Sequence, residues 1–123
     1  MTELDRCYQQ RHTVESTGNF LGDTLKILGI ESEVRENAFA NLPKTGPVVV
    51  AANHPYGGVE GVVLADELRK IRPDVKVMAN FLLGRIEELR EHFILVDPFG
   101  GSGASKKNLQ PLREAIDWLK QGG

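Results

Sequence analysis

The sequence predicts an α/β domain with a mainly parallel sheet and helices on both faces. Short apolar segments alternate with longer ones whose apolar residues recur every three or four positions, which is typical of strands alternating with helices. The connections are short, and right-handed crossovers between parallel strands place helices on both faces of a sheet. The 123 residues are 41% hydrophobic and 26% charged, an ordinary composition for a single globular domain spanning residues 1–123.

The amino-terminal part is predicted to be a polar lead-in, residues 1–12, followed by an amphipathic helix over residues 13–29. The apolar stripe of this helix contains Val14, Phe20, Leu21, Leu25, Ile27 and Leu28. A helix with such a stripe can pack on a protein core or lie on a lipid surface. The polar face of this helix is only weakly basic, which favours packing on the core. A short strand is expected at residues 32–35, before a turn-rich loop at 41–47.

Residues 30–123 form the expected core, with three strands, two helices between them, a glycine-rich loop and a last helix. In chain order we expect a strand at residues 48–52, a helix at 58–71, a strand at 75–79, a helix at 81–91, a strand at 93–96, the loop at 97–107, and a helix with Leu109, Leu112, Ile116 and Leu119 on one stripe. The continuous apolar run at 48–52 is typical of a strand buried on both faces.

The most informative segment follows that run. Asn53 and His54 come directly after it, Gly57 and Gly58 turn the chain, and a carboxylate follows at Glu60. The imidazole and the acid therefore flank a strand-to-helix turn, the edge at which α/β proteins bind ligands. A histidine oriented by a carboxylate is a general-base pair that can activate a hydroxyl. An ordinary surface contact or a satisfied core pair is the alternative interpretation.

This segment resembles the first motif of the glycerolipid acyltransferases, which include the 1-acylglycerol-3-phosphate acyltransferases. The usual motif is Asn-His, four residues and Asp, whereas here Glu60 comes one position later. The form His-Pro-x-Gly-Gly-x-acid-Gly at residues 54–61 is similar to a bacterial subgroup described as hemolysins or linked to ornithine-lipid synthesis. Residues 78–86 and 93–101 are similar to the subgroup's linking region and to the family's second motif. The resemblance covers roughly residues 30–123.

The resemblance implies an O-acyltransferase that moves a fatty acyl group from acyl-CoA or acyl carrier protein to a hydroxyl of a lyso-lipid acceptor. His54 would be the general base and Glu60 would orient it. No cofactor is expected beyond the donor. The implied substrate-binding residues are Asn53, Gly57, Gly58, Arg85, Asp97, Lys106 and Lys107. The commoner family form has a phosphate-holding Arg after the second-motif Asp, but Pro98 stands here. A lyso-ornithine lipid or a similar acceptor is therefore expected ahead of lysophosphatidic acid.

The family's next motif, a strand carrying Phe-Pro-x-Gly-Glu, is expected after the last helix, where this chain has Gly122 and Gly123. We therefore expect an incomplete acyltransferase core that is inactive alone and that self-associates through an exposed sheet edge. No apolar run approaches the roughly 18 residues of a membrane span. The expected location is the cytoplasm, peripherally on the inner face of the membrane. The single cysteine, Cys7, fits a reducing compartment.

The main alternative is a non-catalytic α/β module that binds phosphate or nucleotide through the loop from Gly100 to Lys107. This loop lies between a strand and a helix, as phosphate loops do. However, a Walker loop needs Gly directly before its Lys and Ser or Thr directly after it. Around Lys106 these positions are Ser105 and Lys107. Nucleic acid is not expected as a partner because the net charge is -2.

No metal is expected, because neither His12 nor His92 has the second histidine that a helical zinc site requires. His12 lies in the polar lead-in, and His92 is expected to face solvent.

Overall fold

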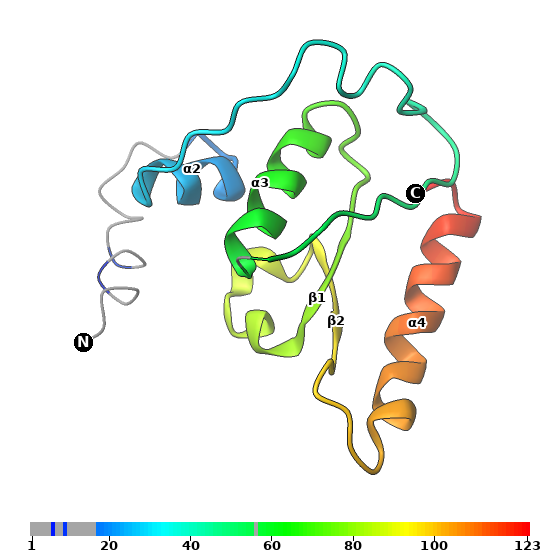
Figure 1. Cartoon of the computed structure of the whole chain (residues 1–123). Helices are drawn as coiled ribbons and strands as arrows, with labels where there is room; N and C mark the ends of the chain where they lie inside the picture. The colour runs from blue at the N-terminus through cyan, green and yellow to red at the C-terminus, as the bar shows by residue number, and fades with distance from the viewer. Residues whose placement is uncertain (1–5, 7–8, 10–16, 56) are drawn as a thin grey trace. The chain divides into compact units, whose positions relative to one another are not determined.

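The computed structural model describes residues 6, 9, 17–55 and 57–123, and these form two compact units (Figure 1). The helical unit comprises the described residues of 1–42 and 54–67, and the sheet unit comprises residues 43–53 and 68–123. The chain contains helices and a parallel sheet, so the α/β class is confirmed. The acyltransferase-like sheet covered on both faces and the single domain stay predictions.

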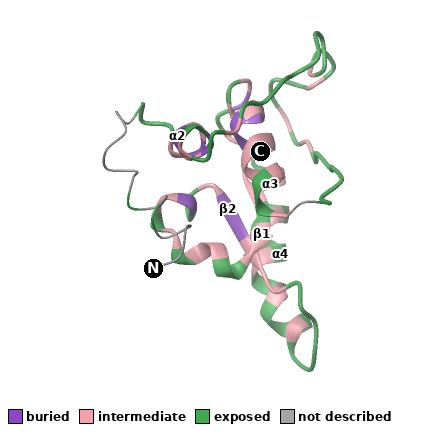
Figure 2. Cartoon of the chain, turned by 60° about the vertical axis from the view of Figure 1, so that its left-hand side comes forward, coloured by how far each residue is buried: buried purple, intermediate pink, exposed green. Residues whose placement is uncertain are grey.

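The helical unit contains the helix α2, Phe20–Ile27. Asn19 caps it, because its backbone is extended and its side chain accepts a hydrogen bond from the Gly22 amide at 3.3 Å. The prediction of a helix from residue 13 is therefore wrong for residues 17–19, while residues 13–16 lie outside the described part. Leu21 and Leu25 are buried, as a core-packing stripe requires (Figure 2).

The second helix, α3, spans Gly58–Arg69, close to the predicted 58–71. Asn19 joins α2 to α3 through a hydrogen bond of 2.6 Å from its Nδ2 to Oδ1 of the buried Asp66. The strand predicted at residues 32–35 is wrong, because that segment is exposed and has no strand partner. Strands need a ladder, and local sequence supplies only the tendency to be extended.

The sheet unit is built on two parallel strands, β1 Val77–Asn80 and β2 Phe93–Val96. Val77 pairs with Phe93, and the register runs without interruption to the pair of Asn80 and Val96. The predicted bounds of β2 are confirmed, whereas β1 begins two residues later than expected. Phe93 and its neighbour on β2 are buried, which places the core of this unit at the amino end of β2 (Figure 2).

The strand predicted at residues 48–52 is wrong, since this segment joins no ladder. Val49 is 77% exposed and Val50 is 44% exposed, so the apolar run is not buried on both faces. The segment is nevertheless held at its start. Arg72, which is 2% exposed, donates to the carbonyl oxygens of Pro43 and Gly46 at 3.1 and 2.8 Å. Arg72 therefore anchors the loop that precedes the apolar run.

The connection between the strands consists of two short 3₁₀ helices, η1 Phe81–Arg85 and η2 Glu87–Leu89. The single α-helix predicted at residues 81–91 is thus wrong. Asn80 caps η1 by accepting from the Leu82 amide at 2.9 Å. Gly84 lies in η1, where a β-carbon would come within 2.5 Å of a Leu95 methyl group. A side chain at position 84 would therefore have to displace this methyl group, and the glycine found there weakens an α-helix.

The last helix, α4, spans Ala104–Lys120 and packs on β2. It begins inside the predicted loop of residues 97–107, so the loop is shorter than expected. The predicted stripe is only partly buried, with Leu109, Leu112 and Ile116 exposed by 49%, 47% and 51%. Across the described residues, no helix combines the length and apolarity that a membrane span requires.

Candidate active site

His54 and Glu60 meet across the turn that begins α3. His54 Nδ1 lies 3.0 Å from Glu60 Oε2. Gly57 has a φ of 90°, a left-handed conformation that a glycine adopts without steric cost, and Gly58 is the first residue of α3. The reversal at Gly57 brings together two side chains that are six positions apart. Glu60 lies in the first turn of α3, where the helix dipole favours a carboxylate.

The exposure of the two side chains differs in a way that matters for chemistry. The His54 side chain is 61% exposed and the Glu60 side chain is 27% exposed. A neutral imidazole that keeps its proton on Nδ1, the nitrogen next to the carboxylate, carries its lone pair on Nε2. A half-buried carboxylate thus orients an exposed imidazole. This arrangement can remove a proton from a group that approaches from solvent.

Asp97, predicted as a substrate-binding residue, lies directly after β2 and is held by local hydrogen bonds. The Asn108 side chain accepts from the Asp97 amide at 2.7 Å and donates to the Asp97 carbonyl at 2.8 Å. The carboxylate accepts from the Phe99 amide at 3.1 Å and lies 3.6 Å from Lys107 Nζ. The structure therefore brings Asp97 and Lys107 together, and part of the lysine charge is already directed at a carboxylate.

Three further residues predicted to bind substrate are also in the sheet unit. Asn53 ends the exposed apolar run, Arg85 ends η1, and Lys106 is in the first turn of α4; all three are exposed. The alternative phosphate loop contains Gly100, Gly101 and Gly103, whose φ values are 73°, 98° and 106°. Lys106 and Lys107 are helical and do not belong to this loop.

His92 is more buried than the sequence predicts. Its side chain is only 15% exposed, so the prediction that it faces solvent is wrong. Burial lowers the pKa of His92, the nearby charge of Arg69 lowers it further, and Glu91 opposes both effects. The exposure of this histidine depends on how the strand that follows it packs. Cys7 and His12 lie outside the described residues.

One feature of the site was missed by the sequence analysis. A groove of about 410 Å³ runs beside Glu60 in the helical unit. Its lining consists of Ser32, Glu33, Val34, Arg35, Ala38, Phe39, Val59, Glu60, Val63, Leu64 and Glu67. The only sequence signal is the recurrence of Val59, Val63 and Leu64 on one face of α3. The opposite wall has no regular structure, so periodicity could not have found it.

Within the described ranges, no cluster of three or more His, Cys, Asp or Glu side chains could hold a metal ion. The family of the chain is decided by comparison with known proteins. A family model described as acyltransferase matches residues 4–110, which include His54, Glu60 and Asp97. The chain belongs to the acyltransferase family.

No curated protein and no solved structure matches this acyltransferase. Membership in the family makes acyl transfer its general chemistry. The assignment to the hemolysin or ornithine-lipid subgroup stays a prediction, as do the roles of the individual site residues.

Proposed function

We propose that this acyltransferase moves a fatty acyl group from a thioester donor, acyl-CoA or acyl carrier protein, to a hydroxyl of a lyso-lipid acceptor, with His54 as general base. The observation that carries the proposal is the 3.0 Å pairing of His54 Nδ1 with Glu60 Oε2 in a protein of this family. The exposure of the imidazole supports it further, because both substrates must reach Nε2.

In the proposed reaction, Nε2 of His54 accepts the proton of the acceptor hydroxyl while the oxygen attacks the thioester carbonyl. Glu60 stabilises the imidazolium that forms and holds the ring in the productive tautomer. The backbone amides at the start of α3 are the proposed donors to the developing oxyanion. The intermediate then expels the thiolate, which takes the proton from Nε2. An ester and a free thiol result, and no acyl-enzyme is needed.

The acceptor is proposed to be a lyso-ornithine lipid or a similar amphiphile ahead of lysophosphatidic acid. Pro98 offers no donor where a phosphate-holding arginine would be expected, and Lys107 already faces the Asp97 carboxylate at 3.6 Å. The reaction is proposed to take place at the inner membrane surface, because the acceptor is a lipid.

The test is transfer of a labelled acyl group by the intact gene product to both acceptors, offered at equal surface concentration. His54→Ala should remove nearly all transfer, and Glu60→Gln should reduce it by about 10²-fold, because the imidazole loses its orientation. Glu87→Gln removes an exposed carboxylate from η2 in the other unit and should leave transfer unchanged. Transfer by His54→Ala within a few-fold of the wild type would end the proposal. A strong preference for lysophosphatidic acid would refute the order of acceptors.

A further inference from the structure

We propose that the groove along α3 holds the fatty acyl chain of the donor, and that the hydrogen bond between Ser32 and Glu67 closes its far end and limits chain length. This inference rests on the proposed function, since it names a substrate group for the same site. The groove is defined by residues 32–39 on one wall and by one face of α3 on the other. All of these residues belong to the helical unit.

The groove starts at the reactive pair. Glu60, which orients His54, is one of its lining residues. Glu67 lies seven positions further along α3, almost two full turns, so the two carboxylates share one face of the helix. The rise of an α-helix places them roughly 10 Å apart along its axis. A chain that enters beside Glu60 would therefore run along α3 toward Glu67.

The space between these ends suits hydrocarbon. Six apolar residues line the groove: Val34, Ala38, Phe39, Val59, Val63 and Leu64. Val34 and Val59 are 41% and 40% exposed, so apolar surface in the groove is open to solvent. The volume of about 410 Å³ is within the range of small-molecule pockets. An alkyl chain lying there would remove this surface from water.

The charges of the lining argue against an anionic occupant. Three lining residues are carboxylic acids, Glu33, Glu60 and Glu67, and one is a cation, Arg35. A phosphate or a free carboxylate would be repelled by this acidic excess. An uncharged alkyl chain is not repelled, provided that its polar end stays outside the apolar stretch. The acyl chain of a thioester meets this condition, because its carbonyl would remain near His54.

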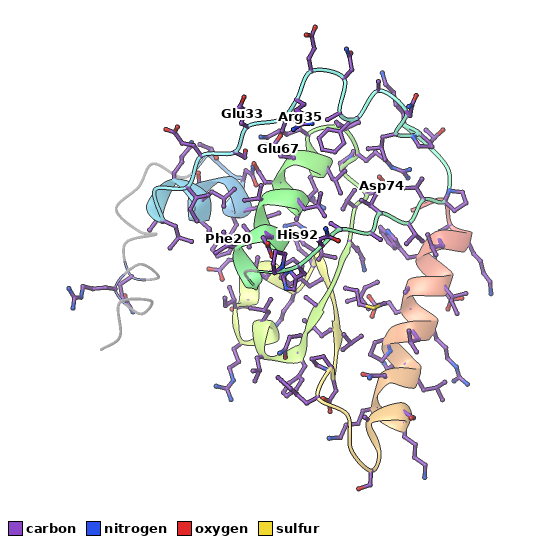
Figure 3. All side chains as sticks on the ribbon, in the orientation of Figure 1. Phe20, Glu33, Arg35, Glu67, Asp74 and His92 are labelled. Atoms are coloured by element: carbon purple, nitrogen blue, oxygen red, sulfur yellow. The ribbon has the colours of Figure 1, made fainter. Side chains whose placement is uncertain are left out.

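A polar contact joins the two walls of the groove at the end away from Glu60. Ser32 Oγ donates a hydrogen bond of 2.6 Å to Glu67 Oε1. Arg35 and Glu67 both lie at the carboxyl-terminal end of α3 (Figure 3). Methylene groups pushed against these groups would strip water from a charged carboxylate, which is unfavourable. The contact should therefore act as a stop for the chain terminus.

The test is the dependence of kcat/KM on donor chain length, measured with the intact gene product and a series of saturated acyl donors that increase by two carbons. Each methylene that enters apolar surroundings favours binding roughly fourfold. Glu67→Ala should move the optimum to longer chains, and the donor two carbons above the wild-type optimum should gain on the order of tenfold. Ser32→Ala should move it in the same direction by less.

Ala38→Leu narrows the groove and should move the optimum to shorter chains. Glu36→Ala removes an exposed acid from the same segment without touching the groove, and its profile should match the wild type. Ser32→Ala and Ala38→Leu keep the test valid if Glu67→Ala fails to fold, because both residues are exposed. An unchanged donor profile in these variants, or a shift only in the preferred acceptor chain, overturns the groove proposal while acyl transfer stands.

A second measurement separates the two proposals. Calorimetric binding of the methyl ester of a saturated fatty acid, which carries no charge, to His54→Ala, the transfer-deficient variant, should be weakened several-fold by adding Ala38→Leu. If the wild type transfers no acyl group but this binding behaves as expected, the proposed reaction fails and the groove stands. If the ester does not bind, or binds equally with Ala38→Leu present, the groove proposal is refuted.

Discussion

Asn108 should stabilise the sheet unit through the backbone of a single residue, Asp97. Its amide accepts from the Asp97 N–H at 2.7 Å and donates to the Asp97 carbonyl at 2.8 Å. These bonds tie the end of β2 to the first part of α4 across the glycine-rich loop. The informative change is Asn108→Ala, which removes both bonds and leaves the helix backbone intact.

The expected loss in free energy of unfolding on Asn108→Ala follows from these two hydrogen bonds. Each is worth about 0.5–1.5 kcal/mol net, and together they contribute about 1–3 kcal/mol. Alanine is the better helix former by about 0.5 kcal/mol, which offsets part of the loss. Because the site is only part-buried, water can replace some of the lost contacts. We therefore expect the free energy of unfolding to fall by about 1–2 kcal/mol, or about 4–8 °C in melting temperature.

Urea unfolding followed by the fluorescence of Trp118, the single tryptophan, measures this effect inside the same unit. The midpoint should fall while the slope with denaturant stays constant. Gln110→Ala is the matched control, since Gln110 is an exposed amide on the same helix. It should change the free energy of unfolding by less than about 0.5 kcal/mol. If Asn108→Ala is indistinguishable from Gln110→Ala, the two bonds do not stabilise the loop and this reasoning is wrong.

Two further predictions concern pH and the catalytic turn. The pKa of folded His92 is lowered below its ordinary 6.5, so between the two values the unfolded chain binds more protons and the free energy of unfolding should fall as pH decreases. In His92→Gln, the free energy of unfolding should therefore depend less on pH below about 6.5, and a pH profile equal to that of the wild type would contradict this assignment. Gly57→Ala should lower the free energy of unfolding by about 1–2 kcal/mol, because a side chain is strained at a φ of 90°. Gly58→Ala, where the β-carbon meets open space, should leave it almost unchanged, and equal unfolding midpoints for the two variants would contradict the predicted strain.

Local sequence was sufficient for part of the fold and for the candidate pair. The bounds of β2, the start of α3 and the closure of His54 onto Glu60 all depend on short-range properties. These are the composition of a strand, the onset of helical periodicity, and a glycine turn between residues six positions apart. The catalytic role of His54 and Glu60 stays a prediction, which the acyl-transfer measurements on their variants test.

The remaining features were decided by tertiary contacts. Residues 48–52 have the composition of a buried strand, yet Val49 is 77% exposed, because burial requires a partner that composition cannot supply. Residues 81–91 have the periodicity of one α-helix, yet they contain two 3₁₀ helices at 81–85 and 87–89, and η1 packs against β2 with Gly84 next to Leu95. The groove beside Glu60 depends on a wall at residues 32–39, which lies 19 to 26 positions before the start of α3 and has no periodicity of its own. The sequence by itself thus determined the elements and the turn that carries the reactive pair. Only the tertiary structure decided which surfaces meet, because contacts between distant segments leave no local pattern.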